Sequence, residues 1–247
     1  MKPPYPDESI ETYELVHSVQ NDVNLISDFV SSLPRMPVTV LEFAAGTGRL
    51  TLPLAEAGFS ITALDLSPTM LEILQRRTRG YDVSTACGDF RNELVHGIFD
   101  LCVIVTNTLF MVPGWKEQQR VLSQAANCTA DNGYLILETY DPRIYLDQPE
   151  TFSLSVPLTE QHLLTDTAFV DHVAEKVTLI RTVTGPENQS FYTETSHWLA
   201  PRELDILASS VGFELLERYE DLAKNPYVTQ SKNLVSVYQK TCQGEER

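Results

Sequence analysis

The first half of the chain alternates short apolar runs with segments of helical pattern. The clearest run, Phe99–Thr106, is apolar except at Asp100 and Thr106. A strand without a polar face is typical of a parallel sheet that helices cover on both sides. Comparable runs occur at Val38–Phe43, Ser60–Asp65, Tyr81–Cys87 and Gly133–Thr139. Strands that alternate with helices at this spacing predict an α/β fold with a doubly wound sheet.

Two helix signals support this interpretation. Ser67 followed by Pro68 gives an N-cap and a proline at the first helical position, so a helix should run to about Arg77. Before the first strand, apolar residues recur at three- and four-residue spacing over residues 10–33. We expect a helical cap over about residues 8–33, at the open end of the sheet.

The pattern changes at residue 150. Residues 150–200 hold no long helix, and their strand-like stretches are Phe152–Val156, His172–Ile180 and Phe191–Trp198. A helix from Pro201 and two more strands follow. We therefore expect an α/β domain made of residues 1–149 and 201–247, with an antiparallel β lid over residues 150–200 inserted into it.

The chain is strongly acidic, with 18 Lys and Arg residues against 34 Asp and Glu residues and a net charge of −16. A nucleic-acid binder needs a basic face, and so does a protein that binds an anionic membrane surface. The composition therefore argues against both partners.

The location of the protein is predicted from three features. There is no secretory signal at the N-terminus and no apolar run long enough to cross a bilayer. The four cysteines have no CxxC spacing, and Cys87 and Cys102 are interpreted as reduced core residues. We expect a soluble, cytoplasmic protein without disulfides.

Candidate ligand-binding residues follow the first three strands, where an open α/β sheet binds its ligands. Gly46 and Gly48 follow the first strand, Asp65 the second and Asp89 the third. The dinucleotide pattern G-x-G-x-x-G fails in both registers, and no P-loop is present. A nicotinamide-dependent oxidoreductase on the same type of sheet is therefore disfavoured.

Five segments, VLEFAAGTGRLTLPLA, ITALDLSPTMLEIL, ACGDF, FDLCVIVTNTLFMV and NGYLILETY, resemble the successive motifs of class I S-adenosylmethionine-dependent methyltransferases. The resemblance covers residues 35–142 and fits the ending at 201–240. It implies a seven-stranded Rossmann-like sheet whose last strand is antiparallel. It also implies S-adenosyl-L-methionine as cofactor, S-adenosyl-L-homocysteine as product, and no metal.

The resemblance also implies a set of cofactor-binding residues. The loop from Ala44 to Gly48 would hold the methionine part, and Asp65 the ribose. Asp89 would meet the adenine amino group. The full set is Tyr13, Glu42, Ala44, Gly46, Gly48, Asp65, Leu66, Met70, Gly88, Asp89, Phe90, Thr106 and Asn107.

One position departs from the family pattern. Ala44 stands where the family usually has its first glycine, so a methyl group is expected to narrow or tilt the methionine pocket. Tyr13, on the N-terminal helix, is interpreted either as a lid residue over the cofactor or as a packing tyrosine.

The insertion bears on the substrate. A β-rich insertion after the fifth strand resembles the lid of small-molecule methyltransferases, such as the sugar-amine N-methyltransferases and related natural-product enzymes. The Asn/Asp-Pro-Pro-aromatic motif of nucleic-acid base methyltransferases is absent, and Thr106–Leu109 stands in its place. The aromatic-rich lid fits either an apolar substrate or a homodimer contact.

The expected reaction is an in-line displacement at a sulfonium, with a nitrogen or oxygen, and less readily carbon, as acceptor. Candidate bases are His197, Tyr140 and His162, with His172 a further histidine of the insertion. Residues 150–200 hold seven acidic and two basic side chains, which slightly favours an amine substrate. The alternatives are a relative that catalyses a cyclisation or rearrangement, and a non-catalytic scaffold.

Overall fold

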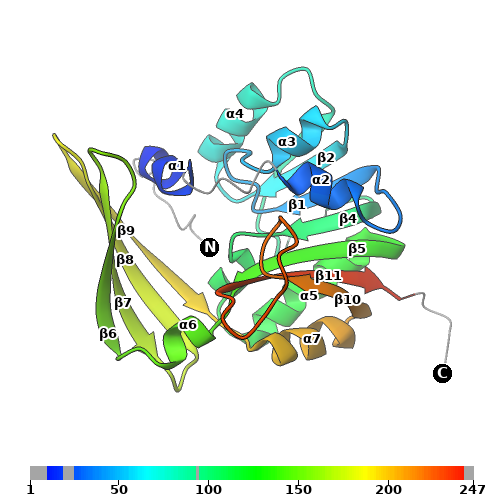
Figure 1. Ribbon diagram of the computed structural model, residues 1–247. Helices are drawn as coiled ribbons and strands as arrows, with labels where there is room; N and C mark the ends of the chain where they lie inside the picture. Colours follow the sequence, from blue (N-terminus) through cyan, green and yellow to red (C-terminus); the bar gives the residue numbers. More distant parts are fainter. Residues whose placement is uncertain (1–9, 19–24, 93–94, 242–247) are drawn as a thin grey trace.

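A central sheet organises the computed structural model, which describes residues 10–18, 25–92 and 95–241 (Figure 1). Its seven strands lie in the order β10-β11-β5-β4-β1-β2-β3. The strands are β1 (Thr39–Phe43), β2 (Ser60–Asp65), β3 (Val83–Cys87), β4 (Phe99–Ile104), β5 (Thr129–Tyr140), β10 (Phe213–Tyr219) and β11 (Asn233–Lys240). Strands β1 to β5 pair in parallel, whereas β11 is antiparallel to both β5 and β10. The predicted fold class is confirmed.

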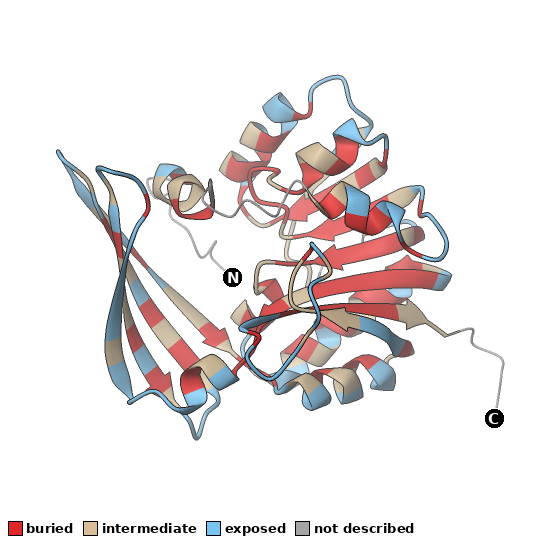
Figure 2. Cartoon of the chain, viewed as in Figure 1, coloured by how far each residue is buried: buried red, intermediate tan, exposed pale blue. Residues whose placement is uncertain are grey.

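Helices cover both faces of this sheet, which explains why β4 is apolar on both sides (Figure 2). One apolar core lies under α2 (Ile26–Ser31), α3 (Thr51–Glu56) and α4 (Pro68–Arg77). The other lies under α5 (Trp115–Cys128) and α7 (Pro201–Ser210). Ser67 caps α4 as predicted, because its hydroxyl accepts a hydrogen bond from the Met70 N–H at 3.2 Å.

The segment after β5 forms a second, four-stranded antiparallel sheet, which we call the lid. It follows the short helix α6 (Arg143–Leu146). Its strands are β6 (Thr151–Pro157), β7 (Leu163–Asp171), β8 (Lys176–Thr184) and β9 (Gln189–His197), in that order across the sheet. Strand β7 was not predicted, and the prediction of a strand beginning at His172 is wrong. His172 lies in the turn between β7 and β8, because Asp171 accepts a hydrogen bond from the Ala174 N–H at 2.9 Å.

Helix α1 (Ile10–Ser18) lies between the lid and the α/β body (Figure 1). Val16 packs against Leu158, Leu164 and Val183 of the lid. Glu14 forms a 2.7 Å ion pair with Arg77 of α4 on the other side. Two helices, α1 and α2, lie within residues 8–33, where a helical cap was expected, while residues 8, 9 and 19–24 lie outside the described part. Helix α1 bridges two parts of the molecule.

The three described cysteines differ in their exposure to solvent. Cys102 and Cys128 are buried free thiols, but Cys87 is exposed, so its interpretation as a core residue is wrong. Strand β3 is an edge strand, which leaves Cys87 at the rim of the sheet. No helix among the described residues is long and apolar enough to span a membrane.

Candidate functional site

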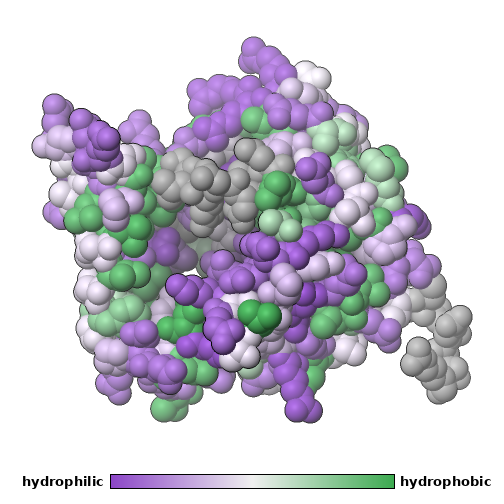
Figure 3. All heavy atoms as spheres, in the orientation of Figure 1, coloured by the Kyte–Doolittle hydropathy of each residue, from purple (hydrophilic) through white to green (hydrophobic). Residues whose placement is uncertain are grey.

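A cavity of about 270 Å³ lies where the carboxyl ends of β1, β2 and β4 face the lid. The molecule is hollowed between the lid and the α/β body (Figure 3). Ten of the residues predicted to bind the cofactor line this cavity: Tyr13, Glu42, Ala44, Gly46, Asp65, Leu66, Met70, Asp89, Phe90 and Thr106. The topology brings them together because the parallel strands all end at one edge of the sheet.

Three predicted residues are not among those that line the cavity. A side chain at Gly48 would lie 3.0 Å from Leu74, so this glycine allows α4 to approach the loop. The Gly88 N–H donates to the Asp65 carbonyl at 2.9 Å. The Asn107 side-chain oxygen accepts a hydrogen bond from the Tyr140 N–H. These three residues do not line the cavity, but their contacts help to hold the loops that do.

Asp65 holds the glycine loop against the end of β2. Its Oδ2 accepts the Gly46 N–H and its Oδ1 the Ser67 N–H, both at 2.8 Å. Burial raises the pKa of Asp65, while these two bonds act in the opposite direction. An ionised carboxylate has about four acceptor sites. Asp65 therefore keeps capacity for hydroxyl groups of a ligand in the cavity.

The loop itself has a left-handed backbone. Gly46 has φ +57° and Ala44 has φ +56°. Glycine adopts this conformation freely, whereas an alanine there is strained. The departure at Ala44 therefore leaves the loop's conformation in place and adds a methyl group to the cavity wall.

The end of β3 contributes a paired carboxylate and a ring. The Arg91 guanidinium donates hydrogen bonds to the Asp89 carboxylate, with Nε 2.8 Å from Oδ1. These hydrogen bonds lower the pKa of Asp89. Phe90 stacks on Phe43, with ring centroids 5.6 Å apart. Asp89 remains ionised near neutral pH and Phe90 offers a fixed apolar surface.

Glu42 lies at the base of the cavity. Its Oε2 accepts the Thr51 hydroxyl at 2.7 Å, and burial raises the pKa of Glu42 to about 7. Arg49 was not predicted as a site residue, although it directly follows Gly48. The Arg49 guanidinium donates to the Thr106 hydroxyl at 2.5 Å and lines the cavity. Arg49 supplies a positive charge next to Glu42 for a ligand carboxylate.

Tyr13 brings α1 into the same wall. A Cβ atom built on Gly46 would lie 3.6 Å from the Tyr13 hydroxyl oxygen. Burial raises the pKa of Tyr13 to about 12, so the hydroxyl stays protonated at neutral pH. This position fits the interpretation of Tyr13 as a lid residue.

The lid contributes residues that the sequence analysis missed: Thr193, Glu194 and Thr195 of β9. On the inner face of the lid, the Arg181 Nε lies 3.8 Å from Glu194 and 3.4 Å from Asp166. All three side chains are less than a quarter exposed. One cation between two carboxylates leaves this face with a net negative charge.

The candidate bases lie away from the cavity. His197 lines a separate cleft of about 260 Å³ with Trp115 and Glu203. The His162 ring pairs with the Thr159 hydroxyl at 2.9 Å, next to the β8–β9 hairpin. The Tyr140 hydroxyl pairs with Ser196 at 2.7 Å, and burial raises its pKa. The structure does not bring these three side chains to the cavity at the ends of β1, β2 and β4. Within the described ranges, no three His, Cys, Asp or Glu side chains are grouped so as to hold a metal ion.

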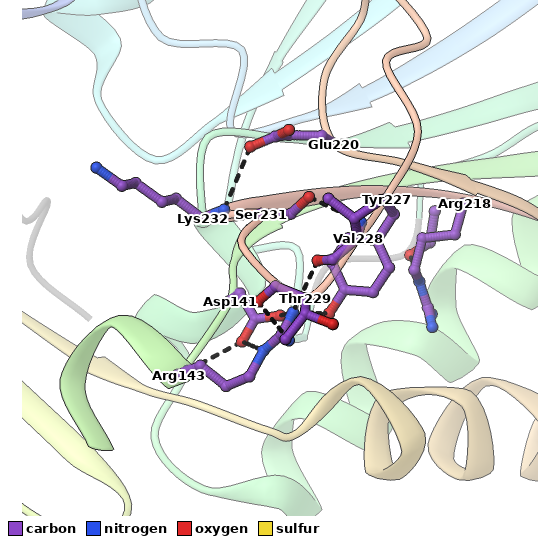
Figure 4. Close-up of polar contacts among 10 residues, drawn as sticks. Asp141, Arg143, Arg218, Glu220, Tyr227, Val228, Thr229, Ser231 and Lys232 are labelled. Carbon is purple, nitrogen blue, oxygen red and sulfur yellow. Dashed lines mark hydrogen bonds and ion pairs between the residues drawn. The ribbon is translucent and has the colours of Figure 1, made fainter. Parts of the chain in front are cut away.

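An ion pair between the buried Asp141 and the partly exposed Arg143 anchors the start of the lid (Figure 4). The fully buried Asp141 accepts the Arg143 Nε at 2.9 Å and the Tyr227 hydroxyl. Arg143 also donates to the Thr229 carbonyl at 2.8 Å. The network ties the end of β5 to the loop between β10 and β11, which fixes the point where the chain enters the lid.

Comparisons with known proteins agree with this arrangement. Residues 40–133 match a family model described as a methyltransferase domain. The cypemycin N-terminal methyltransferase of a Streptomyces species is 27% identical, over 96% of this chain and 97% of that protein.

Two solved structures share the fold. The CcbJ methyltransferase of Streptomyces caelestis superposes with a TM-score of 0.82, covers 90% of each chain and is 24% identical. CalS10 of Micromonospora echinaspora, an amino pentose methyltransferase solved with S-adenosylmethionine bound, has a TM-score of 0.71, with 17% identity and 96% and 98% coverage. The chain therefore carries a methyltransferase domain over residues 40–133 and resembles the class I S-adenosylmethionine-dependent methyltransferases along its length, and S-adenosylmethionine is its cofactor.

Proposed function

We propose that the protein transfers a methyl group to the nitrogen of an amine, carried by a small molecule or a short peptide of natural-product type. The main support is the position of Glu194 on β9, in the wall of the cavity that Asp65 and Gly46 also line. Amines are cationic at neutral pH, and a carboxylate at the wall attracts and orients them. The acidic inner face of the lid acts in the same direction.

The cavity residues fit the cofactor. The Asp65 carboxylate would accept hydrogen bonds from the ribose hydroxyls. Phe90 would pack on the adenine ring, and Asp89 would accept a hydrogen bond from the adenine amino group. The loop from Ala44 to Gly48 would hold the methionine part, with Arg49 facing its carboxylate. When bound, the cofactor supplies a methyl group activated by a positively charged sulfur.

The chain's own residues would position the acceptor and remove its proton. Thr106, Met111 and Val112 follow β4 and line the cavity between the cofactor residues and the lid. Glu194 would accept a hydrogen bond from the ammonium group and take up one of its protons, which leaves the nitrogen lone pair free to bond to the methyl carbon. Because fixed geometry supplies most of the acceleration in such a transfer, one carboxylate suffices.

The names of two relatives support nitrogen as the acceptor atom. One acts at an N-terminus and the other on an amino pentose. The free thiols Cys87, Cys102 and Cys128 favour a reducing compartment such as the cytoplasm as the site of action.

Matched acceptors test the proposal. The protein is incubated with S-adenosylmethionine and with pairs that differ only at the nucleophile, such as glucosamine and glucose or phenethylamine and phenethyl alcohol. Tandem mass spectrometry locates the new methyl group. We expect a methyl group on nitrogen, formed only with the amines. Methylation of oxygen or carbon, or cofactor turnover into a cyclised product without methylation, would overturn the proposal.

A further inference from the structure

Strand β9 has one free edge. It is the last strand of the lid sheet, and among the strands that the structure describes it pairs only with β8. In an antiparallel pair, the main-chain N–H and C=O groups of alternate residues point to the partner strand and those of the residues between point away. The register runs unbroken from Lys176 opposite His197 to Thr184 opposite Gln189. The alternation between residues that bond to β8 and residues that point away from it, which we call the phase, is therefore the same along the whole strand.

Three hydrogen bonds establish that phase. The Trp198 N–H donates to the Glu175 carbonyl and the Gly185 N–H to the Asn188 carbonyl, both at 2.9 Å. Even-numbered residues of β9 therefore bond to β8. The carbonyl of His197, an odd-numbered residue, instead accepts the Gln118 side chain from outside the lid at 2.7 Å.

It follows that Thr193 and Thr195 direct their main-chain N–H and C=O groups away from β8. Both residues line the cofactor cavity. Among the described residues, none forms a main-chain hydrogen bond to either of them. Thr193 is exposed and Thr195 is half-buried, so these main-chain groups are accessible to a ligand in the cavity, which can replace their hydrogen bonds to water.

We propose that the acceptor is a peptide whose N-terminal segment adds as a short strand to the free edge of β9 at Thr193 and Thr195. This inference rests on the proposed amine methylation and specifies its substrate class. A peptide repeats N–H and C=O groups at the same spacing as β9, which a sugar or a simple amine does not. The α-ammonium group would then lie beside Glu194, whose charge complements it. Because the cavity also holds the cofactor, only the first residues of the peptide would enter.

A proline scan of the edge tests the protein side. Thr193→Pro removes a free-edge N–H without breaking the β8–β9 ladder. Phe191→Pro is the matched control, because Phe191 has the same phase, is 70% exposed and is not among the described residues that line the cavity. Each protein is saturated with S-adenosylhomocysteine and titrated calorimetrically with alanyl-alanyl-alanine amide. We expect binding about tenfold weaker in Thr193→Pro and unchanged in Phe191→Pro, with the S-adenosylhomocysteine affinity equal in both.

The ligand side uses two further probes. The analogue with an ester in place of the first amide lacks one N–H, and hexylamine lacks the peptide backbone altogether. We expect the ester to bind about tenfold more weakly than the amide, and hexylamine to be insensitive to Thr193→Pro. Equal binding by the two proline variants, or a tripeptide no tighter than hexylamine, would overturn the inference. These readouts are binding constants, so they separate this inference from the amine methylation, which the methyl-transfer assay tests.

Discussion

Gly46 and Asp65 are joined by a 2.8 Å hydrogen bond from the Gly46 N–H to the Asp65 Oδ2, which ties the loop after β1 to the end of β2. The second carboxylate oxygen holds the Ser67 N–H, at the start of α4. One carboxylate thus organises two loops of the cavity wall and keeps acceptor sites for a ligand.

Asp65→Asn should weaken S-adenosylmethionine binding by about 10- to 100-fold, because the amide cannot accept both N–H groups and loses its charge. Calorimetric titration measures the dissociation constant. Asp82→Asn is the control, since Asp82 is an exposed carboxylate before β3. Equal affinities of the two variants would refute the ribose assignment of Asp65.

Ala44→Gly should raise the free energy of unfolding by about 1 kcal/mol, because Ala44 has φ +56°. It should also tighten cofactor binding, because the methyl group leaves the cavity wall. Ala45→Gly is the neighbouring control, and it should lower the free energy of unfolding, because Ala45 is buried and φ is not positive there. Urea unfolding of both variants measures the difference, and a loss of stability in Ala44→Gly would contradict the argument from strain.

Glu42 should make the protein less stable as the pH rises. Its pKa is raised from 4.5 to about 7 by burial, so the folded state holds a proton that the unfolded state releases. Stability should therefore fall between about pH 4.5 and pH 7, by up to about 3 kcal/mol from this group. Glu42→Gln keeps an acceptor for Thr51 and should remove this part of the pH dependence. Unfolding free energies across that range, compared between the two proteins, test the sign, and parallel curves would contradict it.

Gly48 should tolerate a side chain worse than Gly58 does. The two glycines have φ +90° and +92°, but a Cβ atom at Gly48 would lie 3.0 Å from Leu74, whereas nothing lies within 4 Å of one at Gly58. Gly58→Ala should cost about 1 kcal/mol from backbone strain, and Gly48→Ala about 1–3 kcal/mol more. Thermal unfolding separates the two effects. Equal losses would mean that α4 does not depend on this close approach.

Much of the cavity wall on the α/β side could be predicted from the sequence, because its signals are local. Gly46, Asp65 and Asp89 each follow a strand whose apolar run is visible, and parallel strands bring such ends together. Arg49 could have been found in the same way, as the residue that ends the glycine loop.

The cavity residues of the lid were less predictable, because they depend on how the lid strands pair and pack. The segment 191–198 was correctly predicted to be strand-like, yet neighbouring residues of a strand point to opposite faces. Glu194 lies in the part of β9 that lines the cavity together with Thr193 and Thr195, whereas His197, at the end of the strand, lines another cleft. Nothing in the segment alone identifies which part of the strand meets the cavity, since that depends on the pairing with β8 and on Tyr140 contacting Ser196.

The role of Glu194 is the central claim, and a kinetic comparison tests it most directly. Glu194→Gln keeps the size of the side chain and removes its charge, while Glu187→Gln does the same on the exposed β8–β9 turn. The measurement is kcat/KM for an amine acceptor, together with the dissociation constant of S-adenosylmethionine. We predict that Glu194→Gln lowers kcat/KM by about 10- to 100-fold at an unchanged cofactor affinity, and that Glu187→Gln changes neither. An unchanged kcat/KM in Glu194→Gln would contradict the account.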